Sequence, residues 1–218
     1  MTDKILSLIP ARKGSKGIPR KNLRNLGDHP LVAHAINTSK ESSLIDHVAL
    51  TTDSQEMAQI GRQYGVDTVI DRPTRLATDE IPLAPVIEHA AEEIDCEFQY
   101  MLCFQPTAPL VSVNSLDQGI ATGLNDDADS VVFVRDSTHI YWKKGDDGYE
   151  PISNARKNRQ QLDSIYEEIG VFLTKKNMVK KGTRVGDSPT FYEVEEAEGI
   201  DIDTYADWIL AESQLQRK

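Results

Sequence analysis

Cysteines, aromatic residues and long apolar runs are all scarce in this chain of 218 residues. It has two cysteines, Cys96 and Cys103, and aromatic residues make up 6% of the sequence. Two lone cysteines without a nearby histidine exclude a disulfide framework and argue against a metal site of the cysteine type. The apolar runs are only as long as strands, which excludes a membrane-spanning helix. The first residues lead straight into such a run and lack the features of a signal peptide, so we expect a cytoplasmic protein.

Positive charge is also scarce, and this limits the possible partners. The chain has 24 basic and 35 acidic residues, a net charge of −11. Such a chain lacks the broad basic face that nucleic-acid binding requires. Basic residues are nevertheless concentrated in one stretch without acidic neighbours: Arg12, Lys13, Lys16, Arg20, Lys21 and Arg24. A charge run alone is typical of a solvated turn, so its meaning depends on the surrounding residues.

Strand-like and helix-like segments alternate over the first 135 residues. The expected strands are 4–9, 46–52, 66–70, 98–105 and 130–135. The expected helices are 30–39, a segment from Asp53 or Ser54 to 64, 82–94 and 112–123. This alternation predicts βαβ units in a doubly wound, Rossmann-like α/β sheet. Ligands bind beyond the carboxyl ends of such strands, so the segments after Ile9, Thr52, Ile70 and Gln105 are candidates for the site.

The pattern changes after Arg135. Residues 139–144, the turn at 145–148 and residues 149–152 predict a β-hairpin. Two later strands, 169–174 and 190–194, and a closing helix, 204–216, complete the expected elements. We interpret residues 1–218 as a single domain and residues 136–168 as an excursion from its sheet.

The loop after the first expected strand, residues 10–22, combines two glycines with several cations. Glycines let backbone N–H groups turn toward an anion, and lysine or arginine supplies charge that a triphosphate needs. The loop lacks the Gly-Lys-Ser/Thr ending of a Walker A motif and is not a GxGxxG loop. These absences weaken the kinase, ATPase and dinucleotide-binding interpretations.

A pair of aspartates, Asp201 and Asp203, lies near the end of the sequence in GIDIDT. In a strand-like context, side chains two apart point to the same side. Paired carboxylates suit Mg²⁺, which prefers oxygen ligands and shares them with substrate phosphates. The alternative is structural, because Asp203 directly precedes a helix and is suited to be its N-cap.

Five motifs occur in order along the chain: IPARKGSKGIPRKN at 9–22, RPTRLATD at 72–79, FQPTAPL at 104–110, RQQL at 159–162 and DIDT at 201–204. Together they resemble the signatures of the CMP-sialic acid synthetases, the acylneuraminate cytidylyltransferases. The resemblance implies a mixed sheet of the nucleotide-diphospho-sugar transferase type. It also implies Mg²⁺-dependent transfer of CMP from CTP to the anomeric hydroxyl of a nonulosonic sugar acid, with release of pyrophosphate.

The resemblance also implies roles for single residues. CTP would be bound by Ala11, Arg12, Gly14, Ser15, Lys21, Asn22, Arg72, Ala77, Thr78 and Asp79. The nine-carbon sugar acid would be bound by Gln105, Arg159, Gln160 and Gly170. Asp201 and Asp203 would hold Mg²⁺, and the catalytic residues would be Arg12, Lys21 and Asp203. The hairpin would join a homodimer and reach the neighbour's site, where Lys143, Lys144 or Arg156 would act in trans.

The acceptor half departs from the family pattern. Asp163 stands where proline is usual, Ile169 replaces an asparagine, and Glu167 and Glu168 precede it. Acidic residues there would alter recognition of the sugar's tail, so N-acetylneuraminate, legionaminate, pseudaminate and other nonulosonic acids stay open. Two further alternatives are another acceptor, such as an eight-carbon keto-acid or a polyol phosphate, and a non-catalytic nucleotide-binding homologue.

Overall fold

The computed structural model describes residues 4–146, 148–152 and 158–216, and one mixed seven-stranded sheet forms its centre. The strands are β1 (Ile5–Pro10), β4 (His47–Thr52), β5 (Thr68–Asp71), β6 (Tyr100–Phe104), β7 (Ser130–Asp136), β10 (Tyr166–Lys175) and β11 (Pro189–Glu193). Their order across the sheet is β11-β7-β10-β6-β1-β4-β5. The strands β6, β1, β4 and β5 are parallel, whereas β10 is antiparallel to β6 and to β7. The predicted Rossmann-like mixed sheet is therefore confirmed.

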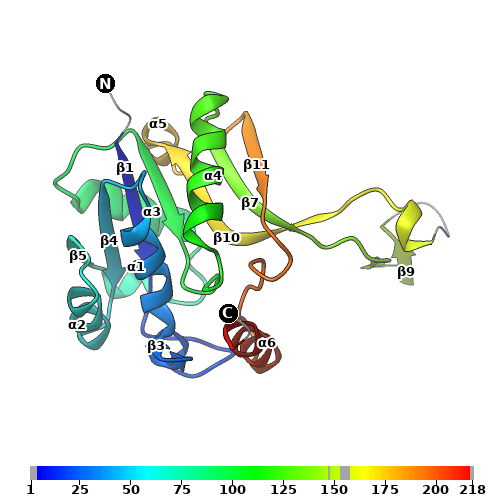
Figure 1. The fold of residues 1–218 in the computed structure, drawn as a ribbon, viewed down its shortest axis with the longest axis horizontal. Helices are drawn as coiled ribbons and strands as arrows, with labels where there is room; N and C mark the ends of the chain where they lie inside the picture. Colours follow the sequence, from blue (N-terminus) through cyan, green and yellow to red (C-terminus); the bar gives the residue numbers. More distant parts are fainter. Residues whose placement is uncertain (1–3, 147, 153–157, 217–218) are drawn as a thin grey trace.

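Helices cover both faces of this sheet (Figure 1). They are α1 (Leu31–Glu41), α2 (Gln55–Gln63), α3 (Leu83–Glu93), α4 (Val113–Asn125), α5 (Lys176–Val179) and α6 (Tyr205–Leu215). Apolar residues of α1, α2 and α4 pack with one face, and those of α3 and α5 with the other. The helices expected from the sequence are confirmed within a few residues. Ser54 is the N-cap of α2, because its hydroxyl accepts the Met57 N–H at 3.3 Å.

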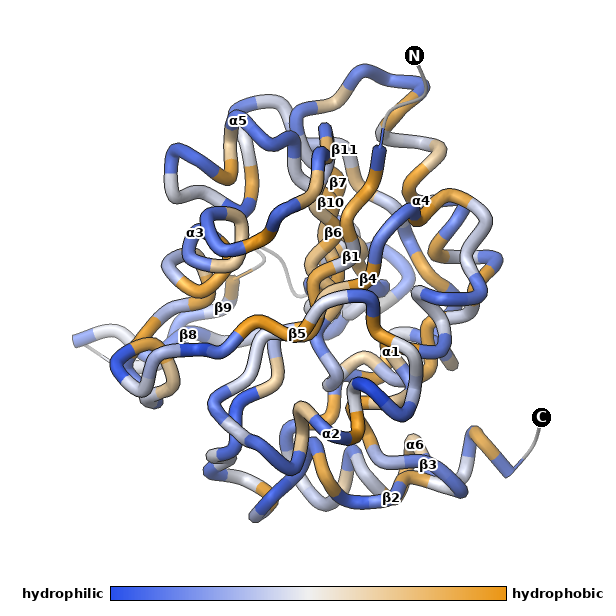
Figure 2. The backbone as a smooth tube through the Cα atoms, turned by 90° about the vertical axis from the view of Figure 1, so that its left-hand side faces the viewer, coloured by the Kyte–Doolittle hydropathy of each residue, from blue (hydrophilic) through white to orange (hydrophobic). Residues whose placement is uncertain are grey.

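The central strands are apolar on both faces, as sandwiched parallel strands require. All five residues of β6 are buried, and Figure 2 shows the sheet as a mostly hydrophobic core under more polar helices. Cys103 lies in this core and Cys96 is half-buried, and both are free thiols. In the part of the chain that the structure describes, no helix is both long and apolar enough to cross a bilayer.

A smaller apolar cluster lies beside the sheet and joins three distant segments. Ile18 from the loop after β1, Ile200 and Ile202 from the segment before α6, and Trp208 of α6 are all buried in it. Because one cluster holds both segments, the basic loop and the acidic pair are brought to the same end of the sheet.

Short elements that the sequence did not predict surround this cluster and the loop. They are η1 (Lys21–Leu23), β2 (Asn25–Leu26), β3 (His29–Pro30) and η2 (Thr74–Leu76). Each has only two or three residues, which is too short for a periodic pattern.

The excursion between β7 and β10 projects away from the body (Figure 1). The strands β8 (Trp142–Gly145) and β9 (Gly148–Pro151) pair antiparallel, which confirms the predicted hairpin, although β8 begins three residues later than expected. The short helix η3 (Arg159–Gln161) lies near this hairpin, at a distance from the sheet. The chain then returns as β10. The boundaries 1–218 and 136–168 stay a prediction.

Candidate active site

A cleft lies at the carboxyl ends of β1, β5 and β6. Ten of the predicted residues line it: Arg12, Gly14, Ser15, Lys21, Asn22, Arg72, Thr78, Asp79, Gln105 and Asp203. They come from the loop after β1, the segment after β5, the loop after β6 and the segment before α6. The structure thus gathers residues separated by nearly the whole sequence into one cavity, at the edge where α/β sheets bind ligands.

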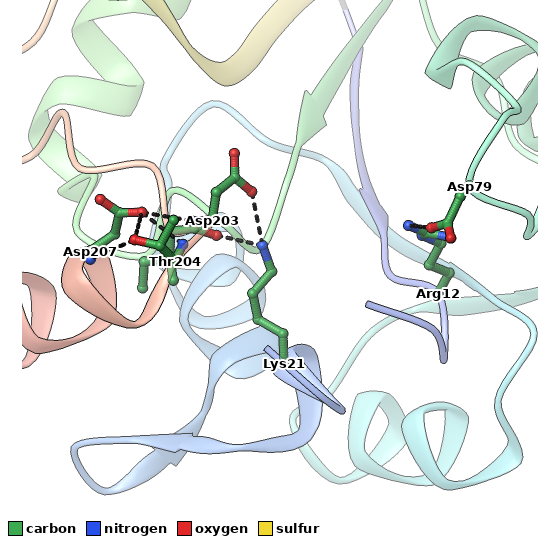
Figure 3. A network of polar contacts seen from close by, with 7 residues as sticks. Arg12, Lys21, Asp79, Asp203, Thr204 and Asp207 are labelled. Carbon is green, nitrogen blue, oxygen red and sulfur yellow. Dashed lines mark hydrogen bonds and ion pairs between the residues drawn. The ribbon is translucent and has the colours of Figure 1, made fainter. Parts of the chain in front are cut away.

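Arg12 and Asp79 form an ion pair across one side of the cleft (Figure 3). The Arg12 guanidinium also donates through Nη1 to Ala77 O at 3.4 Å, and Lys16 Nζ lies 3.4 Å from the other oxygen of Asp79. The Arg12 guanidinium beside Asp79 holds the pKa of that carboxyl below its ordinary value. Two cations of the loop are therefore already paired with one carboxylate of the segment after β5.

Lys21 bridges the other side of the cleft (Figure 3). Its ammonium donates to the carbonyl oxygen of Ile202 and, at 3.1 Å, to Oδ1 of Asp203. The Lys21 side chain is only 10% exposed, whereas that of Asp203 is 76% exposed. Arg20 precedes it with φ 56°, a left-handed conformation that turns the chain into η1. Lys21 therefore anchors the acidic segment as well as lining the cleft.

Two polar contacts hold the loop backbone, one from within the cleft and one from the loop after β4. The side-chain amide of Asn22 donates to Arg12 O at 3.2 Å, and the Lys13 N–H donates to Oδ1 of Asp53 at 2.7 Å. Ala11, by contrast, is fully buried and donates its N–H to Thr51 O at 3.0 Å. The structure places Ala11 behind the cleft lining, so its predicted contact with CTP is not seen in the geometry.

Arg72 is a nearly buried cation at the floor of the cleft, 5% exposed. Its Nη2 donates to Thr51 O at 2.9 Å. Burial lowers the pKa of Arg72 to about 10, and the nearby Asp53 opposes that shift. The guanidinium therefore keeps its charge at neutral pH, and its contact with β4 fixes its position.

Gln105 and Gly170 meet where β6 ends. The Gln105 N–H donates to Gly170 O at 3.1 Å, and Gly170 has φ +75°. A β-carbon at Gly170 would lie 2.9 Å from Gln105 Nε2. Gln105 lines the cleft and Gly170 does not. Because Gly170 has no side chain, the Gln105 side chain can pack directly against its backbone.

The two acidic residues before Gly170 have partners within the chain. Arg135 Nη2 donates to Glu167 at 2.7 Å, and Arg184 pairs with Glu168. Between Glu168 and Phe172 the pairing of β10 with β7 shifts register. The acidic departure from the family pattern is thus compensated by two arginines.

The acidic pair differs from the prediction in its backbone structure. Residues 201–203 belong to no strand, because the backbone bonds that hold them go to loops, such as the Ile202 N–H to Thr107 O at 2.8 Å. Burial still alternates: Ile200 and Ile202 are buried, Asp201 is half-buried and Asp203 is exposed.

The capping alternative for Asp203 is wrong. Thr204 is the N-cap of α6, and it forms a capping box with Asp207: the Thr204 N–H donates to Asp207 Oδ2 at 2.7 Å (Figure 3). The Asp203 carboxylate is therefore not needed by the helix, and it faces the cleft beside Lys21.

Asp201 and Asp203 supply too few oxygen atoms to hold a divalent cation by themselves, so substrate would have to provide further ligands. Asp201 Oδ1 is buried without a hydrogen-bond partner among the described residues, and burial raises the pKa of that carboxyl. Within the described ranges, no group of three or more His, Cys, Asp or Glu side chains is arranged to hold a metal ion. Asp203 lines the cleft and Asp201 does not, so the assignment of both to Mg²⁺ stays a prediction, in which substrate phosphates and water would supply the other oxygen ligands.

Two predicted sugar-binding residues lie away from the cleft of the same chain. Arg159 and Gln160 belong to η3 on the excursion, and Gln160 is exposed there (Figure 1). Arg156 and the side chain of Arg159 lie outside the described residues. The assignments of Arg159 and Gln160 to the sugar acid stay predictions, and they require either a partner chain or a movement of the excursion.

Sequence reasoning missed some residues that line the cleft, both apolar and polar. Leu83 and Val86 of α3 form one wall, and Thr107 follows the predicted Gln105. The signal for Thr107 was present, since it lies two residues after Gln105 at the end of a predicted strand. No local pattern marked Leu83 and Val86, because apolar residues at helical spacing are usually core.

Comparison with known proteins identifies the family. Residues 6–200 match the family model described as Cytidylyltransferase. The chain belongs to the cytidylyltransferase family. It is a nucleotidyltransferase, and the resemblance to the CMP-sialic acid synthetases is confirmed.

Two relatives and one solved structure show the range of this similarity. N-acylneuraminate cytidylyltransferase A of Danio rerio is 28% identical over 98% of this chain, which spans 51% of that protein. CMP-N,N'-diacetyllegionaminic acid synthase of Legionella pneumophila is 27% identical over 98% of this chain and 97% of its own length. The structure of CMP:2-keto-3-deoxy-manno-octonic acid synthetase complexed with CTP superposes with a TM-score of 0.75 at 13% identity, covering 98% of this chain and 99% of that one. This likeness supports the fold.

Proposed function

We propose that this cytidylyltransferase transfers CMP from CTP to the anomeric hydroxyl of a nonulosonic, sialic-acid-like sugar acid and releases pyrophosphate, with Mg²⁺ as cofactor. The observation that carries the proposal is the concentration of Arg12, Lys21 and Arg72 around one cleft of a chain whose net charge is −11. Buried and paired cations at the carboxyl ends of parallel strands suit a polyanionic nucleotide.

The cations offset repulsion between the two substrates. Two unit charges about 6 Å apart at an effective dielectric of about 20 repel by roughly 3 kcal/mol. A sugar carboxylate and a triphosphate brought into one cleft meet at least this repulsion. Arg12 and Lys21 are fixed before substrate arrives, so their reorganisation during the reaction is small.

In the proposed step, the anomeric hydroxyl oxygen forms a bond to the α-phosphorus of CTP. The bond from that phosphorus to the bridging oxygen breaks, pyrophosphate leaves in line, and the hydroxyl proton passes to solvent or a nearby base. Arg12 and Lys21 would hold the triphosphate, Arg72 and Thr78 would border the cytosine, and Gln105 would orient the acceptor. Mg²⁺ held by Asp201 and Asp203 would neutralise charge on the phosphate oxygens.

The acceptor class is drawn from the relatives that match over the full chain. Among these, the Legionella pneumophila protein is named for diacetyllegionaminic acid and the Danio rerio protein for N-acylneuraminate. The arginine-paired Glu167 and Glu168 near Gly170 favour an acceptor whose tail differs from that of N-acetylneuraminate. A legionaminate-like or pseudaminate-like acid fits this requirement.

We further propose a homodimer joined by the hairpin. Its apolar side chains are exposed in a single chain: Ile140 57%, Trp142 58%, Tyr149 71% and Ile152 57%. Monomeric proteins rarely project such a group into water, so a second copy of this chain is the proposed cover. Dimerisation would bring Lys143, Lys144, Arg156 and the η3 residues Arg159 and Gln160 to the partner's cleft. The cytoplasmic location stays a prediction.

The test is turnover across a matched panel. The protein is incubated with CTP, Mg²⁺ and N-acetylneuraminate, diacetyllegionaminate, pseudaminate, an eight-carbon keto-acid or a polyol phosphate, and the CMP-bearing product is identified by mass. The proposal expects pyrophosphate release with at least one nine-carbon acid and none with ATP or with EDTA. Turnover of the eight-carbon acid or a polyol phosphate alone would establish the alternative acceptor. Binding of CTP with no turnover on any acceptor would establish the non-catalytic alternative.

A further inference from the structure

Gly17 lies against the acidic segment with no room for a side chain. A β-carbon placed on it would lie 2.2 Å from the carbonyl oxygen of Asp203 and 3.5 Å from the carbonyl carbon. Gly17 is not among the glycines with positive φ, so the backbone conformation does not require glycine there. The close approach to Asp203 is the reason for glycine at this position.

Neither side of this contact is free to move away. Ile18 and Ile202, the neighbours of Gly17 and Asp203, are fully buried in the same apolar cluster. The Lys21 ammonium donates to Ile202 O, and the Ile202 N–H donates to Thr107 O at 2.8 Å. The two segments are thus held together by residues that follow Gly17 and precede Asp203.

We propose that Gly17 is a positioning residue that sets Asp203 at the distance from the loop at which both share one metal–triphosphate. The inference rests on the proposed function and deepens it. A loop glycine usually serves to turn an N–H group toward phosphate. Because Gly17 has no side chain, the Asp203 backbone can lie directly against the loop, and this contact also sets the position of Asp203. The basic loop and the acidic pair therefore work as one unit.

The test is Gly17→Ala, compared with Gly14→Ala in the same loop. At Gly14 a β-carbon would meet only the flexible end of Arg12, at 3.9 Å, so alanine there causes no backbone displacement. In the absence of any ligand, Gly17→Ala should accelerate hydrogen exchange in the peptide 200–204, and Gly14→Ala should not. The measurement needs no metal and no turnover.

The second readout is the dependence on Mg²⁺. A displacement of about 1 Å can lower a rate about 100-fold, so Gly17→Ala should lower kcat strongly and raise the half-saturating Mg²⁺ concentration. The affinity for CTP in EDTA should change less, because Asp79 and Ala77, and not the acidic segment, hold the Arg12 side chain. Ile202→Val loosens the same contact without a clash, and it should shift exchange and Mg²⁺ requirement in the same direction.

The outcomes separate the possibilities. If Gly17→Ala matches the wild-type protein in both exchange and Mg²⁺ dependence, the positioning role is wrong. Loss of the cooperative thermal transition in Gly17→Ala, with wild-type behaviour of Ile202→Val, would also overturn it. If the wild-type protein neither binds nor converts CTP, the proposed function fails, while the exchange measurement still tests the contact.

Discussion

Replacing Lys21 by methionine removes an ammonium that touches both the cleft and the acidic segment. Methionine keeps a long unbranched side chain but cannot donate a hydrogen bond. The substitution therefore leaves the shape of the site nearly unchanged and removes its charge. We expect two separate consequences, one for stability and one for the reaction.

The stability effect follows from the two acceptors. Ile202 is fully buried, and leaving its carbonyl without a donor costs about 1–3 kcal/mol. The ion pair with Asp203, whose side chain is 76% exposed, contributes about 1 kcal/mol or less. The free energy of unfolding should therefore fall by about 1–4 kcal/mol, which for a chain of this size lowers Tm by roughly 2–16 °C.

The catalytic effect is larger. Loss of one preorganised donor at a site of developing charge lowers kcat by about 100- to 1,000-fold. Pyrophosphate release at saturating CTP, well below the Tm of the variant, measures this without interference from unfolding. The control is Lys40→Met, because Lys40 Nζ lies 3.1 Å from Asp67, the same distance as in the Lys21 pair. That pair lies at the surface, so the control should keep its rate and lose about 1 kcal/mol or less.

Two results would refute this reasoning. If the kcat/KM of the Lys21→Met enzyme stays within about threefold of the wild type, Lys21 does not stabilise charge in the transition state. An unchanged Tm would show that the bond to Ile202 is replaced, for example by water. A lowered Tm with normal turnover would leave Lys21 a structural residue only.

Three further predictions concern other parts of the molecule. Burial acts to raise the pKa of Asp67, but the N–H of Val48 and a lysine outweigh it, so this pKa lies below its ordinary 3.8. Its stabilising contribution is present above that value and lost as pH falls through the folded-state pKa, so Asp67→Asn should lower stability to urea at neutral pH and progressively less as the pH falls through that pKa. A β-carbon at Gly119 would lie 2.2 Å from the Phe133 ring, so Gly119→Ala should cost about 1–3 kcal/mol in thermal unfolding, and an unchanged Tm would contradict that packing. Trp142→Ser should convert the proposed dimer to a monomer in light scattering; a monomeric wild type, or a variant that stays dimeric, would argue against the hairpin interface.

Local features of this protein follow from the sequence because neighbouring residues cause them. The alternation of apolar runs predicts β1, β4 and β6, and the hydroxyl of Ser54 marks the start of α2. Glycines and cations between 10 and 22 indicate an anion-binding loop for the same reason. The family motifs extend this to the cleft, and ten predicted residues line it.

Other features depend on contacts between distant segments. The position of β10 between β6 and β7 follows from the order of strands across the sheet, which no local pattern contains. The prediction that Asp201 and Asp203 lie in a strand fails because loops, not a neighbouring strand, supply their backbone partners. Likewise, the ion pair between Arg12 and Asp79 joins segments that are adjacent only in the folded chain.

The basic loop combines both kinds of feature, one set by its own residues and one set by contacts with distant segments. Its composition by itself predicts that it binds an anion, because glycine and lysine are suited to that chemistry. The tertiary structure alone decided what lies opposite the loop. Lys21 reaches Ile202 across 181 residues, and Gly17 touches the Asp203 carbonyl, because one apolar cluster buries Ile18 together with Ile202. Burial of these isoleucines, a long-range effect, is what joins the loop to the acidic pair.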